Sequence, residues 1–219
     1  MTQLKLSEPE VYQGQFGEFT ITQSDHIGVL VYRSGLMVAA LSFAIGSWLV
    51  LSSGDTATIL SKLTPLYAVF CVALGVSLLT IHIYMALLHR VLQVFWGVGA
   101  ITATVLALQS SEPLAVFIYN HPTAILGIGF TFAALTGIYF KEAFCFNRFE
   151  TKFLTPLVPM LLLGHLAGVL PTAWEQVLLG IWAVLFMVFA LRKVVQPIPA
   201  DIGDKSVFAY LKEQGAAHS

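Results

Sequence analysis

Apolar stretches about 20 residues long recur from one end of this chain to the other. A helix needs about 20 apolar residues to cross the hydrocarbon core of a bilayer, so each stretch predicts a transmembrane helix. Only 11% of the 219 residues are charged and the mean hydropathy is +0.81, whereas a soluble domain carries about 25% charged residues. The sequence therefore predicts an all-α, polytopic membrane protein with a single domain.

Six spans are predicted, and they form a bundle over residues 29–194. A polar cytoplasmic segment over residues 1–28 precedes the bundle, and a cytoplasmic tail over residues 195–219 follows it. The tail has the pattern of a short amphipathic helix that begins at Asp204 and ends at Gly215. The spans are expected at residues 32–51, 66–88, 91–109, 123–140, 153–170 and 173–191.

Shorter elements are expected outside the spans. Residues 11–22 alternate partly between polar and apolar, which predicts a short strand or hairpin. Residues 111–122 have an apolar centre too short to cross the bilayer, so a short helix or turn in the membrane interface is expected there. Ser24 or Asp25 is expected to cap a first helix that begins before its span.

Lysine and arginine are divided very unequally between the two sides of the predicted bundle. If the N-terminus is cytoplasmic, ten of the 11 basic residues lie on that side, and only Lys62 lies on the other. Cytoplasmic loops of membrane proteins carry an excess of these residues. The distribution therefore predicts that both termini are cytoplasmic, with "KEAFCFNRFETK" (residues 141–152) as the longest internal cytoplasmic connection.

Two histidines, His82 and His165, are the ionisable residues expected deepest in the spans. Such residues are costly in a membrane and are functional candidates for that reason, so each could ligate haem or chlorophyll. Helix rise separates their expected depths by about 12 Å, which is too far for both to hold one haem. The alternative is that each imidazole forms a hydrogen bond with a neighbouring helix.

Charged residues gather at the cytoplasmic ends of the predicted spans. A desolvated arginine requires a carboxylate or a lipid phosphate, and Glu142 is the expected partner of Arg33. The alternative is that the cations are ordinary anchors whose charged groups reach toward the headgroups. The residues expected to contact lipid or a partner protein are Arg33, Arg90, Lys141, Glu142 and Arg148.

Small residues recur at helical spacing in two spans. Gly164 and Gly168 form a GxxxG pattern in the fifth span, and Gly129, Ala133 and Gly137 follow one another at the same interval in the fourth. Such spacing allows two helix backbones to approach closely, so these positions are expected to form seams within the bundle. Two prolines are expected to break the fifth span.

Catalytic motifs are absent from the sequence, which contains no HExxH, Walker loop or GxSxG pattern. Cys71 and Cys145 have neither disulfide-framework nor metal-site spacing, and the reactivity of Cys145 is left open. The net charge of −1 gives no reason to expect a nucleic-acid partner. We therefore expect a protein that is not an enzyme.

The stretches "YQGQFGEFTIT", "GVLVYRSGL" and "YFKEAFCFNRFE", with the proline-bounded outer loop, resemble an uncharacterised family of integral membrane proteins, a domain of unknown function found mainly in cyanobacteria. The resemblance covers residues 11–195 and supplies no catalytic residues. It implies a photosynthetic bacterium and a thylakoid or plasma membrane.

Three functions are compatible with the sequence. The first is a non-enzymatic factor that helps to assemble or stabilise a larger membrane complex, for which the resemblance suggests a photosynthetic one. The second is a protein that binds haem or chlorophyll through His82 or His165. The third is a permease for a small molecule or ion, which requires the threonines and histidines of the spans to converge on a polar path.

Overall fold

The computed structural model describes residues 11–13, 17–53, 57–81, 83, 86–198 and 204. A two-stranded hairpin precedes seven α-helices in this part of the chain. The elements are β1 (Val11–Gln13), β2 (Glu18–Thr20), α1 (Gln23–Ser53), α2 (Ala57–Thr80), α3 (Ala86–Gln109), α4 (Leu114–Asn120), the 3₁₀ turn η1 (Pro122–Ala124), α5 (Ile125–Phe146), α6 (Phe149–Leu166) and α7 (Thr172–Val195).

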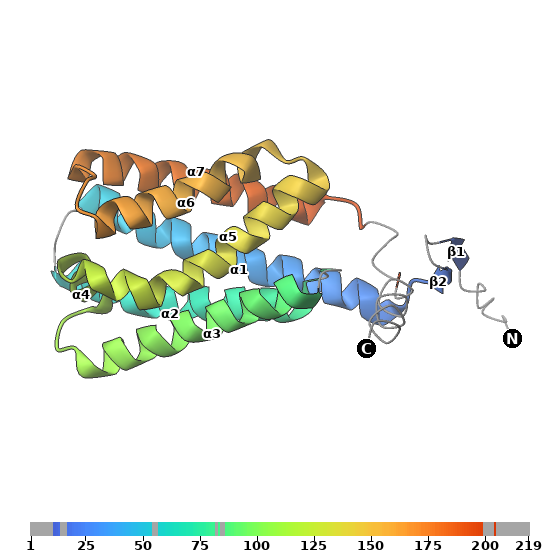
Figure 1. The fold of residues 1–219 in the computed structure, drawn as a ribbon, viewed down its shortest axis with the longest axis horizontal. Helices are drawn as coiled ribbons and strands as arrows, with labels where there is room; N and C mark the ends of the chain where they lie inside the picture. The colour runs from blue at the N-terminus through green and yellow to red at the C-terminus, as the bar shows by residue number, and fades with distance from the viewer. Residues whose placement is uncertain are drawn as a thin grey trace, which may run out of the picture.

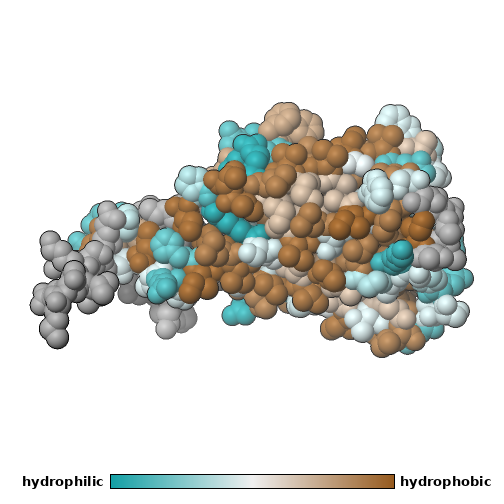
Figure 2. Space-filling model, turned by 180° about the vertical axis from the view of Figure 1, so that it is seen from behind, coloured by the Kyte–Doolittle hydropathy of each residue, from teal (hydrophilic) through white to brown (hydrophobic). Residues whose placement is uncertain are grey.

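The long helices lie side by side, and successive helices run in opposite directions (Figure 1). The strands β1 and β2 lie at the same end of the bundle as the end of α7. We call this the basic end: it is where α1 begins, α5 meets α6 and α7 ends. The short helix α4 lies at the opposite end. Figure 2 shows that the middle of the bundle surface is mostly hydrophobic on the face drawn.

Five helices within the described residues are long and apolar enough to cross a membrane, namely α1, α2, α3, α5 (with η1) and α7. Helix α6 is not among them: over its 18 residues, two prolines together with Glu150 and Lys152 lower its apolar character. It nevertheless packs against both α5 and α7. The sixth crossing therefore stays a prediction, as does the cytoplasmic location of the termini.

Helix α1 begins at a cap that differs from the expected one. Thr22, and not Ser24 or Asp25, precedes the helix, and its Oγ1 accepts a hydrogen bond from the Asp25 backbone N–H at 3.3 Å. The Asp25 carboxylate in turn accepts the Thr22 backbone N–H at 2.9 Å. This reciprocal pair is a capping box, which satisfies two backbone donors that the helix leaves free.

Helix α6 is continuous through Pro156 and Pro159, so the expected break is wrong. It ends earlier than predicted because Gly168 adopts φ +66°. The Gly168 N–H bonds the His165 carbonyl at 2.9 Å, and the Val169 N–H bonds the Gly164 carbonyl at 3.1 Å. These bonds form a Schellman motif. Gly168 therefore ends a helix and does not form the helix–helix seam that its GxxxG spacing predicted.

Both short elements agree with the sequence. Strands β1 and β2 pair antiparallel with Tyr12 opposite Phe19, and the two rings stack at 5.7 Å between centroids. Helix α4 forms in the segment for which a short helix or turn was predicted. The predicted amphipathic helix of the tail lies outside the described residues apart from Asp204, which is buried.

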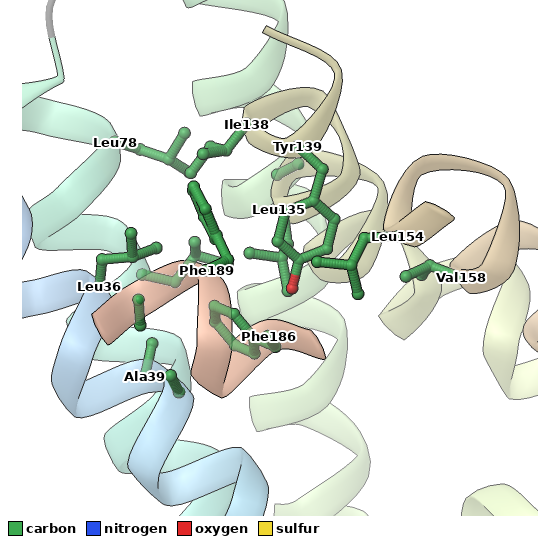
Figure 3. Packing of buried hydrophobic residues seen from close by; sticks show 14 of the residues in the cluster. Leu36, Ala39, Leu78, Leu135, Ile138, Tyr139, Leu154, Val158, Phe186 and Phe189 are labelled. Carbon is green, nitrogen blue, oxygen red and sulfur yellow. The ribbon is translucent and has the colours of Figure 1, made fainter. Parts of the chain in front are cut away.

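The core joins the long helices through large apolar side chains (Figure 3). Phe186 and Phe189 of α7 contact the ring of Tyr139 edge-on, each with 5.6 Å between centroids. Trp182 donates its indole N–H to the Tyr139 hydroxyl at 3.3 Å. Burying each large side chain contributes about 2 kcal/mol in water, but in a bilayer this packing acts mainly through close contact.

Close backbone approach occurs between α3 and α5. A Cβ atom at Gly99 of α3 would overlap the backbone of Thr131 in α5, and one at Gly137 of α5 would overlap the side chain of Leu92 in α3. The seam predicted for Gly137 is therefore confirmed. A Cβ atom at Gly129 would meet only its own helix, at the Ile125 side chain, so the expected seam at that position is wrong.

Candidate functional site

A buried carboxylate lies at the basic end, near the last turn of α5. Glu142 is completely inaccessible to solvent. Its Oε2 lies 2.9 Å from the Lys193 ammonium of α7, and its Oε1 lies 3.2 Å from that of Lys141. The Tyr32 hydroxyl of α1 donates a longer bond to Oε1 at 3.5 Å. One carboxylate thus connects α1, α5 and α7.

Aromatic rings complete the surroundings of Lys193. Its ammonium lies 4.6 Å from the centre of the Phe146 ring and 5.7 Å from that of Tyr32. It also donates to the side-chain oxygen of Gln196 at 3.1 Å. A buried ammonium requires such partners, because burying a charge without compensation costs several kcal/mol. We call Tyr32, Arg33, Lys141, Glu142 and Lys193 the Glu142 cluster.

A second ion pair lies at the same end, between α6 and α7. Glu150 is only 3% exposed, and its Oε2 accepts from Arg192 at 2.8 Å. Its other oxygen is buried and has no hydrogen-bond partner among the described residues. Together with the Lys193 pair, this contact holds the end of α7 against both α5 and α6.

Arg33 does not form the ion pair that the sequence suggested. Its Nη2 donates to the backbone carbonyl of Pro197 at 3.3 Å, while the cations bonded to Glu142 are Lys193 and Lys141. The reason is positional. Glu142 lies inside the bundle and faces α7. There the ammonium group of Lys193 bonds its carboxylate and also contacts the rings of Phe146 and Tyr32. Glu142 is therefore an interior residue and has no surface for the lipid or partner contact predicted for it.

The other predicted contact residues do not join this cluster. Arg90 is exposed near the beginning of α3, and Arg148 is half-buried in the short connection between α5 and α6. Neither forms an ion pair with a described residue. Sequence reasoning missed Lys193 and Glu150. Basic residues are common in the last turn of a helix and acidic residues in the first turn, so neither residue stood out as a site residue.

Four phenylalanines are exposed where α5 meets α6, and we call them the aromatic corner. Phe140 and Phe144 stack at 6.3 Å between centroids, and Phe149 and Phe153 contact at 4.6 Å. Phe144 is 82% exposed and Phe149 is 69% exposed. Arg148 lies between the two pairs in the sequence, so the corner combines apolar rings with a positive charge.

His165 lies at the opposite end of the bundle, in the last turn of α6. Its Nδ1 lies 2.6 Å from Glu175 Oε1, and the Tyr119 ring of α4 lies 5.0 Å away between centroids. His165 is therefore closer to the helix end than its predicted span implied, because α6 begins and ends earlier than expected. His82 lies outside the described residues.

The polar path required by a permease is not formed by the threonines of the spans. Thr80, Thr102, Thr104 and Thr136 each donate to the carbonyl four residues earlier in the same helix, at 2.8 Å. Thr131 is fully buried and bonds Tyr67 of α2 at 2.9 Å. In the described residues, these hydroxyl groups are thus hydrogen-bonded within their own helix or, for Thr131, to one neighbouring helix.

A cavity of about 220 Å³ lies toward the opposite end, between α1, α2, α4, α5 and α7. Apolar side chains including Phe43, Phe70 and Phe132 line most of it. Its Ser42 hydroxyl donates to the Val38 carbonyl, and its Thr64 hydroxyl accepts the Leu114 N–H. The described residues contain no group of three metal-binding side chains at this cavity or elsewhere.

The apolar helices, their uncharged middle and the ion-paired end define an integral membrane protein. The chain belongs to a family described as "Uncharacterized integral membrane protein (DUF2301)", whose model matches residues 76–210. A relative from Haemophilus influenzae, named "Uncharacterized protein", is 27% identical over 188 residues, which cover 84% of this chain and 91% of the relative. No solved structure matches the chain. The Haemophilus relative gives no support to the expected cyanobacterial origin or thylakoid location.

Proposed function

We propose that this protein is a non-enzymatic factor that assembles with a larger membrane complex and stabilises it. In this proposal the bundle crosses the membrane six times, with the basic end in the cytoplasm. Five apolar spans and the packing of α6 between α5 and α7 support the six crossings. The excess of lysine and arginine at the basic end supports the orientation.

The aromatic corner is the observation that carries the proposal. Its four rings are between 51% and 82% exposed, and together they offer about 500 Å² of apolar surface if each side chain has about 200 Å². On surfaces that face water, patches of this size usually mark protein–protein or membrane interaction sites. Phe144 lies beyond Lys141 and Glu142 in the chain, toward the end of α5. A partner protein at this end of the bundle would cover these rings.

Mild-detergent purification from native membranes tests the proposal. We expect a partner to copurify in stoichiometric amount with the wild-type protein and to be lost from the double variant Phe144→Ser, Phe149→Ser. Leu87→Ser is the matched control, because Leu87 is 77% exposed at the same end of the bundle but lies on α3.

The two variants separate a specific contact from a general loss of apolar surface. Retention of the partner by Leu87→Ser, together with its loss from the corner variant, supports the assembly role. Absence of any stoichiometric partner, or equal retention by both variants, would contradict it. A photosynthetic complex is the partner class suggested by the sequence resemblance alone.

A second candidate is a cofactor protein, which the geometry of His165 favours. The Glu175 carboxylate holds Nδ1, and ligating histidines usually donate one ring N–H to such a carboxylate while the other nitrogen binds the metal. An absorption spectrum of the purified protein tests this function. A haem or chlorophyll band lost in His165→Leu but retained in His121→Leu supports it. A spectrum with only tryptophan and tyrosine absorption removes it.

A further inference from the structure

Arg33 is a nearly buried cation without a matching anion. It is 8% exposed, and its Nε is buried with no hydrogen-bond partner among the described residues. The only partner of its guanidinium in this part of the chain is the neutral Pro197 carbonyl, which accepts from Nη2. Buried polar groups are normally hydrogen-bonded, so an unpaired donor on a charged group requires an explanation.

The two buried glutamates described at the basic end, Glu142 and Glu150, do not supply this anion. Both oxygens of Glu142 are occupied, Oε2 by Lys193 and Oε1 by Lys141 and Tyr32. Glu150 is held by Arg192. The Glu142 cluster thus contains three cations and one carboxylate, which leaves an excess of two positive charges. A negative ligand would lower the electrostatic energy of the cluster.

The depth of Arg33 indicates the kind of ligand. Arg33 lies 20 residues before Ser53, the end of α1, which corresponds to about 30 Å along a helix. This is about the thickness of the hydrocarbon core. If the end of α1 lies at one surface of the membrane, Arg33 lies at the level of the phosphate groups on the other.

We infer that the Arg33 guanidinium, beside Lys141 and Lys193 of the Glu142 cluster, binds the phosphate group of an anionic ligand at the basic end. Nε and one Nη form the planar fork that holds two phosphate oxygens at once. The phosphate belongs either to the headgroup of an acidic phospholipid or to a free phosphate. This site is independent of the aromatic corner and of any partner that the corner binds.

Thermal unfolding of the purified full-length protein in mild detergent tests this inference. The probes are phosphatidylglycerol, phosphatidylcholine as the neutral lipid, and inorganic phosphate. We expect phosphatidylglycerol or inorganic phosphate, but not phosphatidylcholine, to raise the unfolding temperature. Arg33→Gln should weaken apparent affinity by about tenfold or more, because it removes the positive charge and the charge-assisted hydrogen bonds to the phosphate. Arg90→Gln is the control, since Arg90 is an exposed arginine at the same end.

The outcomes distinguish the two sources of phosphate. A response to phosphatidylglycerol alone assigns a lipid headgroup, and a response to inorganic phosphate assigns a free anion. The inference is overturned if neither probe stabilises the wild-type protein, or if Arg33→Gln and Arg90→Gln lose the response equally. Should Arg33→Gln fail to fold, Arg33→Lys provides the test, because it keeps the charge but loses the fork; an undiminished affinity in that variant overturns the inference.

Discussion

Glu142 shows how a single carboxylate can hold the end of a helical bundle together. Its position in α5 places it between Lys193 of α7 and Tyr32 of α1, in a region from which water is excluded. The Glu142 carboxylate and the Lys193 ammonium are each costly to bury alone, and their ion pair offsets that cost. The stability of the basic end should therefore depend on both members being present.

Glu142→Gln removes the negative charge and leaves Lys193 buried opposite a neutral group. We expect a loss of about 3 kcal/mol in the free energy of unfolding, which is the usual effect of removing one partner of a buried ion pair. Thermal unfolding of the purified protein measures this change. The double variant Glu142→Gln, Lys193→Met removes both charges, and its loss should be smaller. An unfolding temperature unchanged in Glu142→Gln would contradict this account.

At the scale of elements, the contact between α3 and α5 depends on where the helices approach most closely. Gly99 faces the backbone of Thr131. At Gly97, two residues earlier in the same helix, a Cβ would have no atom within 4 Å apart from the backbone of its own helix and its chain neighbours. The two glycines lie in the same helix but differ in packing: Gly99 is buried against α5, whereas Gly97 is partly exposed.

Gly99→Ala should force α3 away from α5 and destabilise the protein by about 1–3 kcal/mol, the typical cost of overpacking. Gly97→Ala should be neutral or stabilise the protein by up to about 1 kcal/mol, because alanine favours a helix over glycine. Thermal unfolding of both variants in the same detergent gives the comparison. If the two substitutions changed the unfolding temperature equally, the close approach of α3 and α5 at Gly99 would not be important for stability.

The elements also show which features of the fold the sequence could predict. Hydropathy identified the long apolar helices and the short α4, because the bilayer sets their composition. It did not identify where the helices begin and end. Thr22 starts α1 and Gly168 ends α6 through local hydrogen bonds, which hydropathy does not detect. The partner of Glu142 was also missed, because the adjacency of α5 and α7 is a property of the folded bundle.

For the whole molecule, the central topological expectation is that the basic end lies in the cytoplasm. A native reporter exists for this test, since Cys145 is exposed at that end while Cys71 is buried. We expect a membrane-impermeant maleimide to label inside-out vesicles and to leave intact cells unlabelled. Cys145→Ser should abolish the labelling. Labelling of intact cells that Cys145→Ser abolishes would place the basic end outside and contradict the orientation.

The proposed assembly role is tested most directly by a photoreactive amino acid, p-benzoylphenylalanine, placed at the position of Phe144 and irradiated in native membranes. The same amino acid at the position of Leu87 is the control. Our account predicts one discrete protein adduct from the Phe144 position and no such adduct from the Leu87 position. Adducts with lipid alone at both positions would show that the aromatic corner only contacts the bilayer, and would contradict the assembly role.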